Sequence, residues 1–160
     1  MSATGLDVFD KTLQTTHIWL KEIEEEVGPD RQIAWHVLGV GLRALRDRLQ
    51  PELAAHLAAE LPLLVRGAYY DRYRPSEQPR LTRSREEFVK GVEAELQDVR
   101  PVNPEQAIQS VFGVLNRHVP HGQVEKVRAT LPEDLRELWP NGGEQRTAAK
   151  GGGRKAARGL

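Results

Sequence analysis

The sequence contains no cysteine among its 160 residues. Disulfides and thiolate chemistry are therefore excluded, and a reducing, cytoplasmic setting is expected. Apolar runs are only a few residues long, so we expect no membrane-spanning helix. The amino-terminal MSATGLDVFD has neither the basic flank nor the apolar core of a signal peptide, so we expect none here.

The sequence also lacks any sustained alternation of apolar and polar residues, which would indicate strands. Hydrophobic residues make up 39% and charged residues 29%, which is typical of a globular protein. We predict an all-α fold, a compact helical bundle that forms a single domain over residues 1–143. Residues 144–160 are rich in Gly, Ala, Lys and Arg, and we predict that they form a disordered basic tail.

One apolar pattern occurs twice, seventy positions apart. Residues 45–62 read LRDRLQPELAAHLAAELP, and residues 115–132 read LNRHVPHGQVEKVRATLP, with apolar positions and the final proline matched without a gap. The apolar residues lie three, four or eight positions apart, which is helical spacing. We predict two four-helix repeats, at about 10–70 and 84–140, joined by a linker over 71–83, with the two segments superposing.

Caps and prolines divide the chain into eight expected helices. The first six are expected to start at residue 12, Asp30, Pro51, Leu63, Ser84 and Asn103. His121 and Gly122 should form the break before the seventh helix, and the eighth should be short and end at Trp139 and Pro140. Thr130 and Glu133 should form a capping box around Pro132. Gly39 and Gly41, inside the second helix, should permit close helix packing.

The core is expected along the apolar stripe of each helix. The residues predicted to be buried are Trp19, Trp35, Leu38, Leu45, Leu57, Leu61, Phe88, Ile108, Leu115, Leu131 and Trp139. Leu13 should lie on the inward face of the first helix, and Tyr69, the counterpart of Trp139, should close the end of its repeat.

Three segments carry a resemblance to a known family: TLQTTHIWLKEI, ALRDRLQPELAAHLAAELPLLVRGAYYDRY and VRATLPEDLRELWP. With their connections they cover roughly residues 8 to 140. In these segments the chain resembles the uncharacterised bacterial family of domain of unknown function 2267. The resemblance implies a compact helical protein with a duplicated unit. It implies no reaction, cofactor or catalytic residue, and the tail lies outside it.

No catalytic or cofactor motif stands out. His118 and His121 are three apart, but Pro120 breaks the helix between them, so they make a poor metal pair. A pairing between helices, such as His36 with Glu60, stays open. The acidic run from Glu22 to Glu26 is typical of a solvated helix face, and GGG at 151–153 lies in the tail rather than in a phosphate loop. We therefore expect no enzyme activity, no cofactor and no metal.

Tyrosines and arginines are interleaved at the end of the first repeat, where all three tyrosines of the chain occur. Aromatic and guanidinium groups together suit anion, nucleic-acid or protein surfaces. The candidate interaction residues are Arg66, Tyr70, Arg72, Tyr73 and Arg74. The alternative is a structural role, in which these side chains pack within their own repeat.

The net charge of zero conceals an uneven distribution. Residues 144–160 hold five basic residues and one acidic residue, which gives +4 and leaves −4 on the rest of the chain. The candidate nucleic-acid residues of the tail are Lys150, Arg154, Lys155 and Arg158.

The sequence favours a non-enzymatic module that binds a protein partner or itself. The alternatives are an accessory, sequence-independent nucleic-acid-binding protein that uses its tail and the Arg-rich linker, and a small-molecule pocket between the repeats.

Overall fold

The computed structural model describes residues 3–81, 84–99 and 101–140. Over these ranges the chain folds into eight α-helices and one short 3-10 helix, with no strand. The α-helices are α1 Asp7–Val27, α2 Arg31–Arg46, α3 Pro51–Ala58, α4 Leu63–Tyr70, α5 Arg85–Glu95, α6 Pro104–His118, α7 His121–Thr130 and α8 Glu133–Arg136, and the 3-10 helix is Pro75–Glu77. The predicted all-α fold is confirmed.

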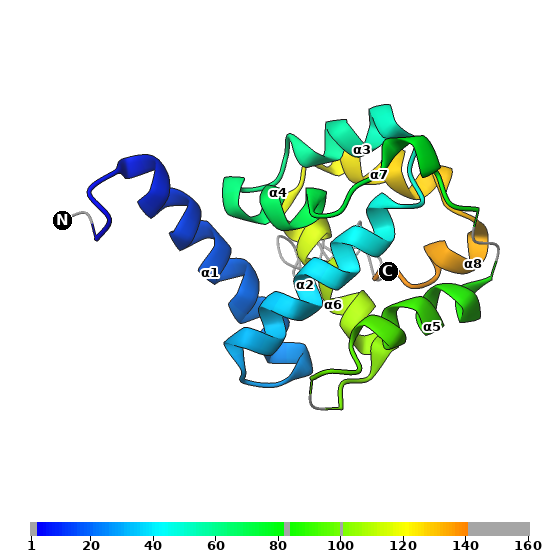
Figure 1. Ribbon diagram of the computed structural model, residues 1–160, viewed down its shortest axis with the longest axis horizontal. Helices are drawn as coiled ribbons and strands as arrows, with labels where there is room; N and C mark the ends of the chain where they lie inside the picture. The colour runs from blue at the N-terminus through cyan, green and yellow to red at the C-terminus, as the bar shows by residue number, and fades with distance from the viewer. Residues whose placement is uncertain (1–2, 82–83, 100, 141–160) are drawn as a thin grey trace, which may run out of the picture.

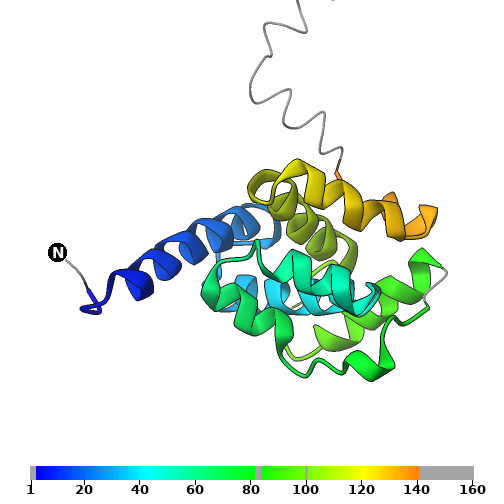
Figure 2. The ribbon, with the colours of Figure 1, turned by 90° about the horizontal axis from the view of Figure 1, so that it is seen from above.

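Helices α2 and α6 form the centre of the molecule (Figure 1). Helix α1 packs against both of them, α4 packs on α2, and α5 contacts both central helices. Helix α3, from the first half of the chain, contacts α7 from the second half. Helix α8 contacts α5 within the second half. The amino-terminal end of α1 extends beyond the body in both views (Figures 1 and 2).

Three of the predicted helix starts are capped as the sequence indicates. The side chains of Asp30, Ser84 and Asn103 each accept a hydrogen bond from the backbone N–H three residues later, at 2.9 to 3.1 Å. The predicted capping box around Pro132 is wrong. The Thr130 hydroxyl donates instead to the carbonyl of Val127 at 2.8 Å, within α7, and α8 begins after Pro132 without a side-chain cap.

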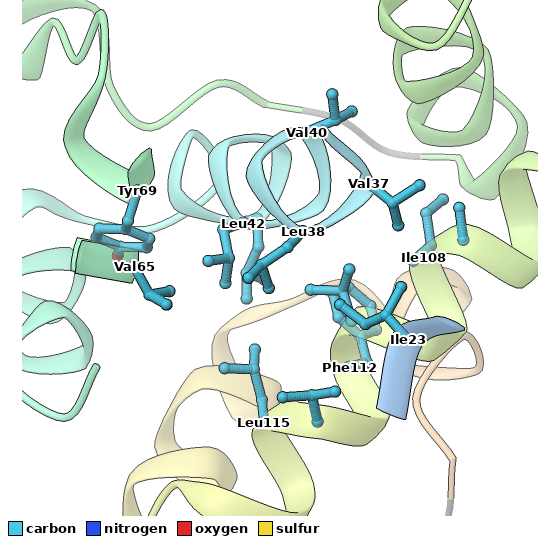
Figure 3. Close-up of a cluster of buried hydrophobic side chains, with 14 of the residues drawn as sticks. Ile23, Val37, Leu38, Val40, Leu42, Val65, Tyr69, Ile108, Phe112 and Leu115 are labelled. Carbon is cyan, nitrogen blue, oxygen red and sulfur yellow. The ribbon is translucent and has the colours of Figure 1, made fainter. Parts of the chain in front are cut away.

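The buried side chains of all eight α-helices form a continuous core, part of which is drawn in Figure 3. Ten of the eleven predicted core residues are buried. Trp35 is the exception, with 36% of its surface exposed, because it borders an open hollow between α1 and α2. Leu13, expected to face inward, is 37% exposed beside the same hollow, and Tyr69 is fully buried as predicted.

Helices α2 and α6 approach closely at Gly41. A Cβ built there would lie 2.8 Å from a methyl group of Val111 on α6, so only glycine permits this contact. Gly39 has different surroundings, because a Cβ built there would lie 2.8 Å from the guanidinium of Arg43 in the same helix. The prediction of close helix packing therefore holds for Gly41.

The helix boundaries keep the seventy-residue offset in part. Helices α3 and α7 begin at residues 51 and 121, and α4 and α8 begin at 63 and 133. Helix α1 has 21 residues and α5 has 11, so the first helices of the proposed repeats differ in length. Superposition of the two repeats stays a prediction. Within the described ranges, none of the helices is both long and apolar enough to cross a membrane.

Candidate interaction surface

Helix α1 carries one apolar stripe along its whole length. Alternating steps of three and four residues lead from Leu6, the N-cap, through Phe9, Leu13, Thr16 and Leu20 to Ile23. Such spacing keeps these side chains on one side of a helix, as in a helix that packs against another helix. We call these six residues the α1 stripe.

The two halves of the α1 stripe have different surroundings. Thr16, Leu20 and Ile23 are buried against the body. Leu6 and Phe9 are 52% and 48% exposed, because this end of α1 extends beyond α2, α4 and α6 (Figure 2). Val8, on a neighbouring face, is also exposed. An apolar surface that continues from a core into solvent is typical of a protein interaction site.

An apolar hollow of about 310 Å³ lies beside the exposed end of α1. Its lining comes from α1, α2 and the start of α4 and is almost wholly apolar at the surface. The residues that line this apolar hollow are Leu13, Thr16, His17, Leu20, Arg31, Gln32, Trp35 and Leu64. Trp35, which the sequence placed in the core, thus contributes its ring to an open surface.

A second, more polar hollow of about 420 Å³ lies on the other side of α1. Val8, Trp19 and Leu63 line it, together with the predicted site residue Arg66. Helix α4 is fixed between the two hollows, because the backbone N–H of Leu64 donates to the Thr12 hydroxyl at 3.0 Å.

Glu22 connects α1 to the end of α6. The acidic run from Glu22 to Glu26 was expected to face solvent, so this contact differs from the prediction. The Glu22 carboxylate accepts hydrogen bonds from Arg117 at 2.8 Å and pairs with Nε2 of His118 at 2.7 Å. The His118 ring also stacks on Trp19, with ring centroids 5.4 Å apart. Burial raises the pKa of Glu22, but the hydrogen bonds from His118 and Arg117 and their charges outweigh it and hold the pKa below its usual 4.5.

The predicted interaction residues do not form one surface. Arg66 has a structural role, since its guanidinium donates to the carbonyls of Ala58 at 2.9 Å and Leu61 at 3.0 Å, after α3. Arg74 is exposed and pairs with Glu77 at 3.4 Å in the linker. The two arginines therefore belong to different parts of the molecule.

Tyr70 and Tyr73 remain together with Arg72 near the end of α4. Tyr70 packs against Tyr73, with ring centroids 5.7 Å apart, and keeps 36% of its surface exposed. Arg72 is exposed and adopts φ of 58°, in the left-handed region that non-glycine residues rarely occupy. These three residues form a turn with an exposed tyrosine and an exposed guanidinium.

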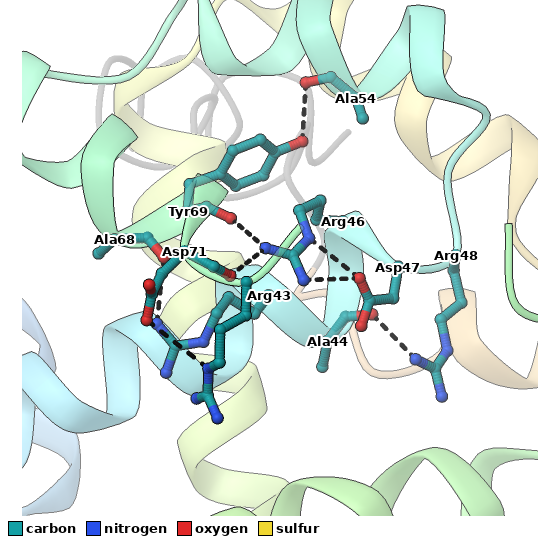
Figure 4. A network of polar contacts seen from close by, with 10 residues as sticks. Arg43, Ala44, Arg46, Asp47, Arg48, Ala54, Ala68, Tyr69 and Asp71 are labelled. Atoms are coloured by element: carbon teal, nitrogen blue, oxygen red, sulfur yellow. Dashed lines mark hydrogen bonds and ion pairs between the residues drawn. The ribbon is translucent and has the colours of Figure 1, made fainter. Parts of the chain in front are cut away.

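Arg46, which the sequence did not single out, holds this turn in place through hydrogen bonds to its backbone (Figure 4). Its buried guanidinium donates to the carbonyls of Tyr69 at 2.7 Å and Asp71 at 2.8 Å, pairs with Asp47 at 2.8 Å and lies 4.9 Å from the Tyr73 ring centroid. Tyr69 completes the arrangement by donating its hydroxyl hydrogen to the Ala54 carbonyl at 2.8 Å. Of the five predicted interaction residues, Arg66 and Tyr73 therefore pack within the fold, whereas Tyr70, Arg72 and Arg74 stay exposed.

The remaining candidates are either separated or outside the described residues. His36 contacts the backbone carbonyl of Glu95 at 3.0 Å rather than Glu60, so the open pairing with Glu60 is not formed. Throughout the described ranges, no three His, Cys, Asp or Glu side chains are grouped as metal ligands. The tail candidates Lys150, Arg154, Lys155 and Arg158 lie outside the described residues.

The exposed end of α1 was missed because the sequence prediction began this helix at residue 12. The signal is nevertheless present in the sequence, since the steps of three and four residues extend back from Thr16 to Leu6. Asp7 and Asp10 in the first turn also favour a helix start there.

Comparison with known protein families matches residues 16–138 to the family described as "Uncharacterized conserved protein (DUF2267)". The match includes all helices from α2 to α8 and the buried part of α1, and begins after the exposed end. Comparison with curated proteins gives no match.

Proposed function

Because the chain belongs to the DUF2267 family, whose description gives no activity, we propose from its structure that it is a non-enzymatic helical interaction module. The module binds a second copy of itself through the exposed end of α1. The observation that supports this most strongly is the α1 stripe, of which one half is covered by the body and the other half is in solvent.

A second copy is the partner that fits this surface best. The same chain presents a projecting apolar helix end and, next to it, an apolar hollow of about 310 Å³. Two-fold symmetry places the α1 end of each copy against the hollow of the other, so that both are covered at once. Charge is compatible with this pairing, because Asp7 lies at the projecting end and Arg31 borders the hollow; Arg31 pairs with Glu24 of its own chain at 3.5 Å and stays exposed.

The apolar area limits the expected strength of the dimer. Fully burying one large apolar side chain contributes about 1.5–3 kcal/mol. Leu6, Phe9, Leu13 and Trp35 are 36–52% exposed, so covering them in both copies contributes on the order of 10 kcal/mol. Association costs at least about 4 kcal/mol in lost translational and rotational freedom, which offsets a large part of this gain. We therefore expect a dimer that dissociates on dilution rather than a permanent one.

Sedimentation equilibrium from about 1 µM to 1 mM tests this proposal, because an interface of this strength dissociates in that range. Each chain has a mass of 18.0 kDa, so the average mass should rise toward about twice that value as concentration increases. Phe9→Glu should keep the protein monomeric, since it places a charge in the apolar contact.

The matched control for Phe9→Glu is Leu81→Glu. Leu81 is 81% exposed in the linker, away from α1, so this variant makes the same kind of change outside the proposed contact. It should associate like the wild type. If the wild type stays monomeric, or if both variants associate equally well, self-association through α1 is wrong.

Sequence-independent nucleic-acid binding through the tail and the Arg-rich linker is the alternative function. The charges favour it, because residues 144–160 carry +4 and the linker exposes Arg72 and Arg74. If the tail neutralises four to five phosphates, a plot of the logarithm of the DNA-binding constant against the logarithm of the salt concentration should have a slope of about −4. Titrations with the full chain and with a chain ending at Asn141 test it, and equal binding by both would rule out the tail.

A further inference from the structure

A cleft of about 230 Å³ lies between the second half of α2 and α5, away from the α1 surface. Five arginines line it against two acidic residues, giving +3 in a molecule whose residues 1–143 sum to −4. The charged residues of this arginine cleft are Arg43, Arg46, Asp47, Arg48, Arg72, Arg80 and Glu95. Such a local concentration of positive charge attracts anions.

Two of these arginines are already engaged by the fold (Figure 4). Arg46 donates to two backbone carbonyls and pairs with Asp47, and Arg43 donates to the carbonyl of Ala68 at 3.1 Å. They hold the end of α4 in place. Asp47 is consequently occupied by Arg46 and is a poor counter-ion for the other arginines of the cleft.

Arg48 is held in place without a matching counter-ion. Its guanidinium lies over the Phe88 ring, 5.0 Å from the centroid, and reaches the Ala44 carbonyl at 3.3 Å. Its buried Nε has no hydrogen-bond partner, and its guanidinium forms no ion pair, among the residues that the structure describes. A charge that is partly removed from water in this way has a cost, which a bound anion would reduce.

Burial is the main source of this cost, and it lowers the pKa of Arg48; Asp47 and Glu87 oppose the effect, and Arg80 adds to it. Burial likewise lowers the pKa of Arg43; Arg72 and Arg46 add to the effect by repulsion, and Asp71 and Glu95 oppose it. Like charges are thus close together at both ends of the cleft, and an anion between them would relieve the repulsion.

Helix α5 leaves room for a ligand at Gly91. A Cβ built on this residue would meet no described atom within 4 Å, so the helix presents backbone and open space to the cleft. The volume is below the usual 300–1,000 Å³ of drug-sized pockets, which favours a small ligand.

We propose that the arginine cleft binds a phosphate-type dianion, either free inorganic phosphate or the terminal phosphoryl group of a small monoester. Guanidinium groups donate in a planar fork that matches the oxygens of a phosphoryl group. A dianion suits a cleft with a net charge of +3 better than a monoanion does. A nucleic-acid backbone fits less well, because each diester carries one charge and the acidic body repels a polyanion.

Calorimetric titration of the full-length protein with inorganic phosphate, at constant ionic strength set with chloride, tests this site. Wild-type protein should bind, and Arg48→Gln should weaken binding at least about tenfold, the equivalent of one charge-assisted hydrogen bond. Gly91→Leu should abolish binding by filling the cleft without changing its charge. The matched controls are Arg136→Gln, which removes one exposed charge on α8, and Gly122→Leu, which adds the same side chain on α7, where a Cβ has space among the described residues.

Two further titrants identify the source of the anion. Glycerol 3-phosphate that binds more tightly than inorganic phosphate assigns the site to a phosphomonoester, and weaker binding assigns it to free phosphate. Dimethyl phosphate, a monoanion, should not compete. Circular dichroism of each variant verifies that it is folded. The proposal is overturned if the wild type does not bind phosphate, if Gly91→Leu binds as well as Gly122→Leu, or if dimethyl phosphate binds equally well.

Discussion

At the level of single residues, the Glu22 carboxylate links α1 to α6 through its contacts with Arg117 and His118. Its pKa lies below the usual value because Arg117 and His118 hold the carboxylate, so the folded protein binds a proton there less readily than the unfolded chain does. The resulting stabilisation is complete above about pH 4.5, the unfolded value, and is lost as pH falls through the lower folded pKa.

Glu22→Gln should therefore lower the free energy of unfolding at pH 7, and the difference from wild type should close as the pH falls from about 5 to 3. Urea unfolding at several pH values measures it. In the Arg117→Gln background the effect of Glu22→Gln should shrink, because the two residues share one contact. A difference that stays constant over this pH range would contradict the assignment.

Leu61 and Leu131 occupy corresponding positions in the two halves of the chain and are 2% and 4% exposed. Replacing either with alanine should cost roughly 2–5 kcal/mol, because it removes buried apolar area and leaves a cavity. Chemical denaturation measures this cost. Leu81→Ala should change stability by no more than about 0.5 kcal/mol, since Leu81 is in solvent. Losses below about 1 kcal/mol at both buried sites would show that the helix faces are wrongly assigned.

At the level of helices, Gly41 and Gly91 should respond in opposite ways to the same substitution. Gly91→Ala meets open space within α5 and should stabilise the protein by about 0.5–1 kcal/mol, as alanine usually does inside a helix. Gly41→Ala brings a methyl group to 2.8 Å from Val111 and should destabilise, because α2 and α6 would have to separate. Thermal unfolding of both variants checks the pair, and shifts of the same sign would refute this account of α2–α6 packing.

The helices were largely predictable because their boundaries depend on local chemistry. Pro51 and Asn103 mark starts through effects that reach only a few residues. The predicted boundary of α1 was wrong, because the helix begins at Asp7 and its N-cap residue is Leu6, which has no side-chain cap to mark the start. Trp35 was wrongly placed in the core because its surroundings depend on where α1 and α4 end, which periodicity within α2 cannot indicate.

For the whole molecule, the sequence predicted the kind of function that we propose, but not the surface. It favoured binding of a protein or of a second copy and pointed to the Tyr–Arg segment. In the structure, Arg66 has a backbone-capping role and Tyr73 lies against Arg46. The exposed α1 surface and the arginine cleft depend on contacts between helices distant in sequence, namely α1 with α4 and α2 with α5. Such contacts are not encoded in local spacing.

The central claim is that a second copy covers the exposed end of α1, and the absence of cysteine makes a direct measurement possible. A nitroxide attached to Gln14→Cys, exposed on α1 but off its stripe, is mixed with unlabelled, ¹⁵N-enriched protein at high concentration. We predict that amide signals of Trp35, Leu63 and Leu64 in the enriched copies are broadened, and that a label at Lys126→Cys on α7 leaves them sharp. Unchanged signals with the Gln14 label, or equal broadening with both labels, would contradict the account.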